Sequence, residues 1–412
     1  MDYDTAMMTP PPVSGDHFPT NVGSEARSNY LRGGIIFTAD YNDNLMQLDS
    51  TRSVSDETYS ILPSVSLSRN TSRQIETLDY TTGFRIYQHT SALNNLSQTG
   101  GAHYRYRISP YIALDVQDYF NQNSNAFNQS NPYSGGGVSG STQSPSSVLI
   151  APYQDQITNE TSGGLNYQFA KDAMIGGRGN FGFVHYPKAG DSTGLYNSKT
   201  SQGSGFYSRR LSRGQYIGGI YQYSNTVTDP VETHTTTNGF NVFYTIFVSR
   251  TVSLSVMGGP QHYTSLQPPF PESSAWTPNV TGSVGWQTPR TNLAATYTRA
   301  VTGGGGLLGT LKSDTASASA QWEMTRTWSS GVGFDYSKRT SATPIFTVAN
   351  EGGRSISGTI SVRHRLTERL SAHAGYSHFN QSYGGISSLS QFPDSNRVFL
   401  SIAYNFTRPL GR

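Results

Sequence analysis

The stretch from Ala316 to Tyr336 reads ASASAQWEMTRTWSSGVGFDY and holds two strand-like patterns joined by a tight turn. In the first half, alanines and Trp322 alternate with Ser, Gln and Glu. In the second half, Val332 and the aromatic residues after it alternate with Gly and Asp. Alternation with a period of two predicts a strand with one apolar and one polar face. We therefore predict a β-hairpin that turns at residues 325–327.

The same unit recurs along the chain from about Tyr30 to Phe406. Two- or three-residue turns are expected near Arg69–Arg73, Ile108–Pro110, Ala170–Asp172, Ser212–Gly214, Ser249–Thr251, Thr288–Thr291, Thr325–Thr327 and Thr367–Arg369. Every other junction is a longer stretch of Gly, Ser, Asn and Pro. Tight turns on one side and long loops on the other are typical of an outer-membrane β-barrel, whose short turns are periplasmic.

The composition agrees with a membrane barrel. Only 13% of the 412 residues are charged, while the chain holds 43 Gly, 26 Tyr, 19 Phe and no Cys. Soluble domains carry about 25% charged residues. No run of about 18 apolar residues exists, so we expect no transmembrane helix. The net charge of +3 gives no support for nucleic-acid binding.

The expected fold is an all-β, closed antiparallel transmembrane barrel of about 18 strands, with 16–18 as the range. The phase of the alternation is ambiguous around Phe206–Leu211, Tyr216–Thr226 and Glu232–Ser249. A soluble propeller or β-solenoid is the alternative. Propellers repeat signature residues in each blade, and no such repeat is present.

The N-terminal residues 1–29 form a separate segment in the sequence. They include Thr9-Pro10-Pro11-Pro12 and lack the basic start and apolar run of a secretory signal. A mature or truncated chain, a different start site, or a longer protein that ends in this barrel all remain open. We expect a flexible periplasmic tail here, with a plug as the alternative, and a barrel over residues 30–412.

The final strand, Val398-Phe399-Leu400-Ser401-Ile402-Ala403-Tyr404-Asn405-Phe406, alternates and ends in aromatic residues. It resembles the closing-strand insertion signal of bacterial outer-membrane proteins of the porin-like type. The resemblance implies that Tyr404 and Phe406 are read by the barrel-assembly machinery. It departs from the family in one respect, because residues 407–412 follow the aromatic that is often the last residue.

The longest external connection is the third, about Asn123–Gln156. In trimeric porins the third external loop folds into the lumen and narrows it, and this loop is similar in position and length. It also contains Val148-Leu149-Ile150-Ala151, an apolar patch. A surface loop is the alternative.

On the assigned phases, a set of charged residues faces the lumen. The predicted pore-lining residues are Arg32, Asp40, Asp79, Arg85, Arg105, Arg107, Asp115, Asp335, Arg339, Arg363 and Arg365, with Arg178 and Glu323 beside them. Rings of charged side chains tune the selectivity of a pore. The alternative is a set of salt bridges that brace the wall, and a mixture of both is expected.

Two other patterns partly match known kinds of site. Asp40, Asn42 and Asn44 have the spacing of half a calcium loop, but the Gly and the bidentate Glu that complete it are missing. Gly190-Asp191-Ser192-Thr193-Gly194 resembles a hydrolase serine motif without the strand–turn–helix context of a nucleophile elbow. We therefore expect no enzyme activity, no cofactor and no metal site.

The expected function is passive diffusion of small solutes through a water-filled pore in the outer membrane, with both termini in the periplasm. One alternative is an exporter of secreted polysaccharide. Another is a barrel that serves as a platform for an enzyme or adhesin. The expected partners are outer-membrane lipid and lipopolysaccharide, the assembly machinery and the solute. A homo-oligomer stays open.

Overall fold

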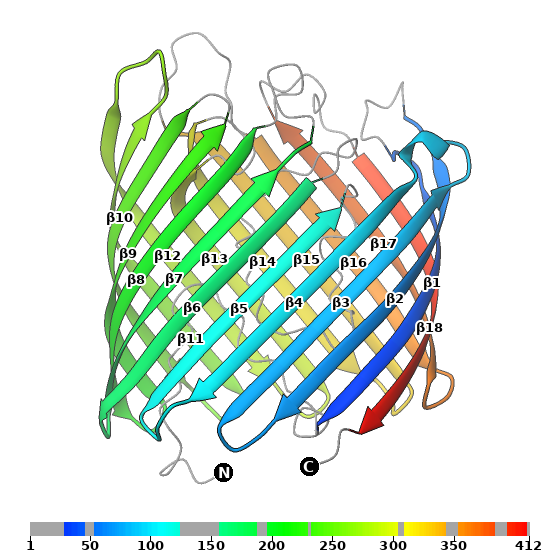
Figure 1. Cartoon of the computed structure of the whole chain (residues 1–412), viewed down its shortest axis with the longest axis horizontal. Coiled ribbons are helices and arrows are strands. Elements are labelled where there is room, and N and C mark those ends of the chain that lie inside the picture. The colour runs from blue at the N-terminus through cyan, green and yellow to red at the C-terminus, as the bar shows by residue number, and fades with distance from the viewer. Residues whose placement is uncertain are drawn as a thin grey trace.

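The chain forms one closed antiparallel sheet of 18 strands (Figure 1). The computed structural model describes residues 29–45, 53–123, 156–187, 196–229, 232–303, 309–342, 353–383 and 394–409. Each strand pairs with its neighbours in chain order, and β18 (Asp394–Pro409) pairs with β1 (Tyr30–Asn42) to close the ring. The predicted fold class and strand number are confirmed.

The strands are 12–16 residues long, more than the 9–11 that cross a bilayer when tilted. The other strands are β2 (Asp56–Asn70), β3 (Gln74–Tyr87), β4 (Asn95–Arg107), β5 (Ile112–Asn123), β6 (Gln156–Ala170), β7 (Ala173–His185), β8 (Asn197–Ser212), β9 (Gln215–Asp229), β10 (Thr233–Phe247), β11 (Val252–Leu266), β12 (Ser273–Gln287), β13 (Thr291–Gly303), β14 (Thr310–Glu323), β15 (Trp328–Ser341), β16 (Gly353–Arg365) and β17 (Leu370–Tyr383). Within the described residues the only helix is the three-residue 3-10 helix η2 (Ser91–Leu93). No helix in this part of the chain is long and apolar enough to cross a membrane.

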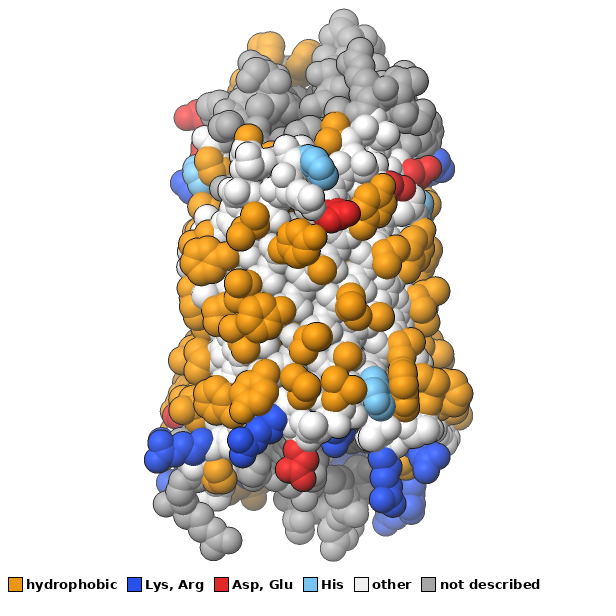
Figure 2. Space-filling view, turned by 90° about the vertical axis from the view of Figure 1, so that its right-hand side faces the viewer, with side chains coloured by type: hydrophobic (Ala, Val, Ile, Leu, Met, Phe, Trp, Pro, Cys, Tyr) orange, Lys and Arg blue, Asp and Glu red, His pale blue; other side chains and the backbone are white. Residues whose placement is uncertain are grey.

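The two faces of the sheet differ in polarity. On β1, Phe37 and Tyr41 are exposed on the outer surface, while Asp40 and Asn42, the neighbours of Tyr41 on either side, are buried on the inner face. Figure 2 shows hydrophobic side chains spread over the outer wall, with Lys and Arg gathered at its lower edge. Large apolar side chains are exposed in the same alternating way on most other strands, among them Phe84 and Ile86 on β3 and Leu400 and Ile402 on β18.

The stretches of ambiguous phase contain apolar side chains that point inward. Ile220 on β9, Phe243 on β10 and Met257 on β11 form a buried cluster on the inner wall, and Phe206 on β8 packs against it. A strand is recognised in the sequence by apolar and polar residues at alternate positions. An apolar residue on the polar face removes that difference. This is why the sequence did not resolve the phase there.

Eight turns of two to four residues join the strands at one end of the barrel, here called the short-turn end. A Ser or Thr hydroxyl closes most of them. Ser249 Oγ accepts hydrogen bonds from the amides of Thr251 and Val252 at 3.1 Å each, and Thr367 Oγ1 accepts from Arg369 and Leu370. Such hydroxyl–backbone bonds favour turns over continued strand. The eight predicted turn positions are confirmed, although several turns are one residue longer than expected.

The opposite end, here called the long-loop end, carries the other nine connections. One of them contradicts the expectation of long loops, because only residues 230–232 separate β9 from β10. The pairing continues to Thr228 and Thr233, whose β-branched side chains favour extended backbone. The two strands therefore stay paired almost up to the connection, which leaves few residues for a loop.

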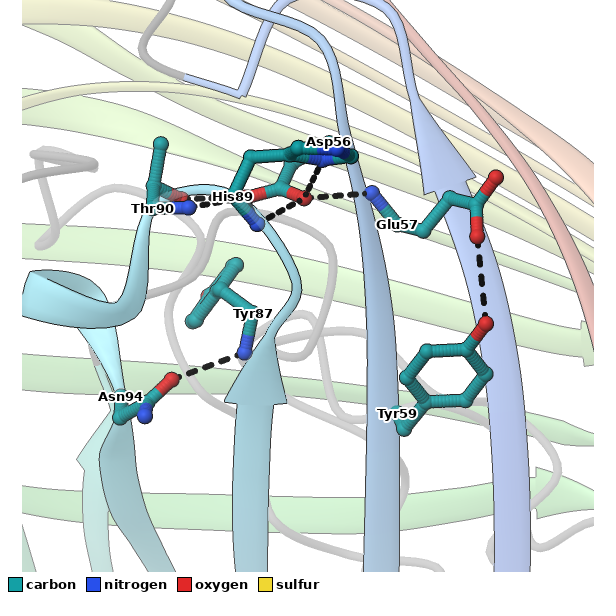
Figure 3. A network of polar contacts seen from close by, with 7 residues as sticks. All are labelled: Asp56, Glu57, Tyr59, Tyr87, His89, Thr90 and Asn94. Atoms are coloured by element: carbon teal, nitrogen blue, oxygen red, sulfur yellow. Dashed lines mark hydrogen bonds and ion pairs between the residues drawn. The ribbon is translucent and has the colours of Figure 1, made fainter.

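Asp56, the first residue of β2, anchors the connection between β3 and β4 (Figure 3). Its buried carboxylate accepts hydrogen bonds from the amides of His89 at 3.0 Å and Thr90 at 2.8 Å, and from the Thr90 hydroxyl. Asn94 Oδ1 accepts from the Tyr87 amide at 2.8 Å on the other side of the loop. These bonds give a short polar loop a fixed conformation at the rim.

Candidate lumen site

All eleven charged residues that the sequence predicts for the lumen lie at inward positions of their strands. Nine of them lie away from the ends of their strands. Arg107 and Arg365 are the last residues of β4 and β16 and are exposed at the short-turn end.

Asp115 on β5 is the centre of one charge network on the inner wall. Its Oδ2 lies 2.9 Å from His103 Nε2 and 3.7 Å from Arg105 Nε, both on β4. Its Oδ1 lies 3.5 Å from Arg178 Nη2 on β7. Two guanidinium groups therefore share the Asp115 carboxylate. Glu160 on β6, which accepts a hydrogen bond from Asn180 of β7, adds a second carboxylate to this sector of the wall.

A second network lies where β18 meets β1. Arg397 Nη2 is 3.1 Å from Asp40 Oδ1, and both side chains are largely buried. Arg85 on β3 is also buried, and it acts electrostatically on Arg397. Within the described part of the chain, Nε and Nη1 of Arg85 have no hydrogen-bond partner. Arg397 and Arg85 together carry more positive charge than Asp40 offsets.

Arg397 and His103 are functional candidates that the sequence reasoning missed. The last strand was expected to begin at Val398, so Arg397 fell outside it. Arg397 lies two residues before Phe399 and four before Ser401, so its side chain is on the same face of β18 as theirs. Extending the alternating pattern by one residue would have placed Arg397 on the inner face.

The other predicted charges are distributed along the wall. Arg32 on β1 and Asp79 on β3 both lie opposite Ser66 of the strand between them. On β16, Arg363 lies opposite His373 of β17. Asp335 on β15 accepts a hydrogen bond from the Ser357 hydroxyl at 3.4 Å.

The arginine pairs on β4 and β16 do not lie at opposite parts of the wall, although the two strands are far apart in the chain. In the closed ring they are separated by five strands, β3, β2, β1, β18 and β17. Closure of β18 on β1 brings strands from the two ends of the chain to the same side.

Charge on the described inward strand positions is positive in total. The arginines are Arg32, Arg85, Arg105, Arg107, Arg178, Arg210, Arg339, Arg363, Arg365 and Arg397. The carboxylates are Asp40, Asp56, Asp79, Asp115, Glu160, Glu323 and Asp335. Ten cations against seven anions leave an excess of three positive charges, and the remaining inward positions are mostly Ser, Thr, Asn, Gln and Gly.

The sheet opens at the long-loop end between β12 and β13. Pairing of these strands ends at Val280 and Arg299, so among the described residues positions 273–279 of β12 are not paired with β13. Residues 300–303 of β13 and 309–311 at the start of β14, here called the flap, instead contact the inner wall. Gly303 lies against Thr226 of β9, four strands away in the ring.

Polar bonds hold the flap in place. Gln261 on β11 donates from Nε2 to the Val301 carbonyl at 3.1 Å and accepts from the Val301 amide at 2.9 Å. The Thr310 hydroxyl lies 2.7 Å from the hydroxyls of both Ser265 and Thr235. Nearby, the Tyr263 hydroxyl donates to the Ala342 carbonyl at 3.0 Å. The flap therefore crosses part of the barrel interior near the long-loop end, and nothing in the period-two pattern indicated it.

The calcium-like residues are engaged in other interactions. Asp40 pairs with Arg397, and Asn42 Oδ1 accepts hydrogen bonds from the Asn44 amide and the Ser395 hydroxyl, both at 2.9 Å. Among the described residues no three His, Cys, Asp or Glu side chains are grouped to hold a metal ion. Ser192 of the serine motif and most of the third external loop lie outside the described residues.

Comparison with known proteins gives structural likeness only. No family model matches the chain, and no curated protein matches it. The structure is similar to the outer membrane protein opdK from Pseudomonas aeruginosa, at 8% identity and a TM-score of 0.42, over 92% of this chain and 99% of that one. It is similar to OccAB4 of Acinetobacter baumannii, at 7% identity and a TM-score of 0.41, over 92% and 98% of the two chains.

A third similar structure is the ferric citrate transporter FecA, at 10% identity and a TM-score of 0.45, over 92% of this chain and 79% of that one. These identities and scores are too low to transfer a solute or a mechanism. The fold assignment therefore depends on the closed 18-stranded sheet itself.

Proposed function

We propose that the chain is an integral outer-membrane channel through which small solutes diffuse passively. The observation that carries the proposal is the contrast between the two faces of a closed sheet. Large apolar side chains such as Leu78, Val332 and Ile360 are exposed on the outside, while Ser, Thr and charged residues cover the inside. An apolar exterior requires lipid, and closure pairs the backbone groups that lipid cannot solvate.

The proposal includes location and orientation. The short turns and both termini face the periplasm, and the long-loop end faces the outside of the cell, as in other bacterial barrels. Outer-membrane lipid and lipopolysaccharide surround the apolar face. Tyr404 and Phe406, exposed on the outer face of β18, are the residues that the assembly machinery would read.

The test is conductance in a planar bilayer. The refolded protein is expected to give discrete current steps, and it should migrate faster on gels before heating than after. A protein that inserts and shows heat-modifiable migration but carries no current would contradict the channel and retain the barrel. A protein that stays monodisperse in plain buffer without detergent would contradict the membrane assignment.

A specific observation supports the export of an anionic polysaccharide as a second candidate. The excess of inward arginines includes Arg85 and Arg397, which face the interior near the seam between β18 and β1. Cations along a lumen favour anionic solutes. Block of the current by added anionic oligosaccharide, and none by a neutral one of equal length, would favour this candidate.

The inner wall gives less support to the second alternative, a barrel that serves as a platform for an enzyme or adhesin. The Phe243 cluster and the flap fill part of the interior, which suits a packed lumen, but most inward positions are polar. A lumen without conductance would favour the platform.

A further inference from the structure

The turns at the short-turn end carry a ring of basic side chains. Seven of the eight turns contain Arg or Lys, and in the eighth Arg107 immediately precedes the turn. The eight residues are Arg73, Arg107, Lys171, Arg213, Arg250, Arg290, Arg326 and Arg369, and all are exposed. The same turns contain only two carboxylates, Asp172 and Glu368. The ring is therefore strongly positive around the whole circumference.

The local structure of the turns presents these side chains outward. In the turn of Thr325, its hydroxyl accepts hydrogen bonds from the amides of Thr327 and Trp328 at 3.3 and 3.0 Å. Arg326 is the residue enclosed by these bonds. In the turn of Thr288, the Arg290 amide is itself one of the two donors to the Thr288 hydroxyl, and the amide of Thr291 is the other. The backbone of the turn is satisfied internally, so the guanidinium groups remain available to a partner.

The ring lies directly beyond a row of outward aromatic side chains. Trp322 and Trp328 flank the turn of Arg326, and Trp286 lies four residues before Arg290. All three tryptophans are exposed on the outer wall. Tryptophan is enriched at the level of lipid headgroups. At about 3.3 Å per strand residue, the basic side chains extend into or just past that level.

We propose that this ring binds the phosphate groups of anionic phospholipids in the leaflet next to the short-turn end, and that it thereby fixes the depth of the barrel. The inference rests on the proposed membrane location. A protein partner would contact one side of the barrel, whereas the cations recur at every hairpin. The partner that surrounds a barrel on all sides is the headgroup layer. Arginine suits it because its guanidinium binds phosphate oxygens in pairs.

The charges at the long-loop end differ in arrangement. Lys199 lies 3.8 Å from Asp229, and Arg299 lies 3.8 Å from Asp314. These two exposed cations each have a carboxylate beside them. The charge complementarity with an anionic leaflet is therefore specific to the short-turn end (Figure 2).

The test compares lipid preference in vesicles. Protein is reconstituted in phosphatidylcholine containing a small fraction of spin-labelled phosphatidylglycerol or spin-labelled phosphatidylcholine, and the motionally restricted fraction is measured. The parent is expected to prefer phosphatidylglycerol roughly fivefold, the factor that one basic side chain near an anionic surface contributes. A variant with Arg250→Gln, Arg290→Gln, Arg326→Gln and Arg369→Gln keeps every Ser or Thr cap and should lose most of that preference.

The matched control removes four cations near the long-loop end by Lys199→Gln, Lys312→Gln, Lys338→Gln and Arg354→Gln, and should keep the preference. Quenching of tryptophan by lipids brominated at defined depths reports the position of the aromatic row and should shift only in the turn variant. Equal lipid preference in the parent, or equal loss in both variants, would overturn the inference. The same vesicles are assayed for conductance, so a channel without lipid preference contradicts the ring alone, and a failure to insert contradicts the membrane assignment.

Discussion

Arg397 on the last strand and Asp40 on the first strand form an ion pair of 3.1 Å inside the seam that closes the barrel. Their positions are 357 residues apart in sequence. Both side chains are largely buried, so each charge depends on the other for compensation. The pair therefore connects closure of the sheet with the electrostatics of its inner wall.

Replacing Asp40 by Leu should destabilise the barrel by about 3–5 kcal/mol, because Arg397 would remain buried without its carboxylate. The double variant Asp40→Leu, Arg397→Met should recover most of the loss. Urea unfolding in lipid vesicles, followed by heat-modifiable migration, measures both. The control is Arg69→Met, which breaks the exposed pair of Arg69 with Glu76 and should cost about 0–1 kcal/mol. Equal costs for both single variants would contradict a structural role for the seam pair.

The two faces of neighbouring strands give a second prediction. Val332 on β15 and Ile360 on β16 are directly paired and exposed outside. Arg at either position should cost about 2–4 kcal/mol if it lies near the midplane of the bilayer. Arg at Thr359, the inward neighbour of Ile360, should change the same unfolding free energy little. A cost of similar size at Thr359 would mean that the inner wall is not solvated.

Orientation can be tested with single cysteines, because the chain has none. Glu272→Cys at the long-loop end should react with a membrane-impermeant maleimide on intact cells. Arg250→Cys and Arg326→Cys in the short turns should react only after the outer membrane is opened. The reverse pattern would show that the barrel is inserted with the opposite orientation.

Selectivity should depend on inward arginines. We expect a modest preference for anions, and Arg363→Ser with Arg365→Ser should reduce it because both side chains occupy inward positions of β16. Reversal potential under a salt gradient measures the effect. The control is Lys338→Ser with Arg354→Ser, which removes the same charge from the outward face of β15 and β16. Unchanged selectivity in the inward variant would leave these arginines as residues that brace the wall.

The flap predicts a change in conductance. Gln261→Leu removes both hydrogen bonds to Val301. Tyr263→Phe removes the bond to the carbonyl of Ala342, a residue whose amide donates to the Thr310 carbonyl of the flap at 2.8 Å. The double variant should show larger or more variable single-channel steps, since the flap is then held by fewer contacts. His262→Ala, between them on the outward face, should behave like the parent. Identical steps in all three proteins would place the flap outside the path of the ions.

Much of the fold could be read from the sequence because two different surroundings act on alternate residues. Lipid outside and polar contacts inside impose the period of two seen in Phe37, Asp40 and Tyr41. The turns were readable because Ser, Thr, Pro and Gly residues favour them locally. The inner wall from Phe206 to Met257 was not readable, since Ile220 and Phe243 place apolar groups on the polar face.

The contacts of the candidate site were readable only in part. The alternation within each strand placed Arg105 and Asp115 on the inner face. The ion pair between them depends on the register of neighbouring strands, which the pattern within one strand does not contain. The pair of Asp40 with Arg397 depends in addition on ring closure. The flap depends on a break in pairing after Val280, where the alternation of neither strand changes.

The capped hairpins have a consequence for how such a chain can vary over evolutionary time. Each hairpin is closed by its own turn residues and pairs in the sheet with the hairpins beside it, and among the described residues the flap is the part that reaches further. Duplication or deletion of one such unit would change the circumference by two strands and preserve both the parity of every side chain and the side on which the turns lie. The hairpin is therefore the natural unit of insertion and loss in this chain, and a relative with a wider or narrower barrel would be expected to differ by whole hairpins.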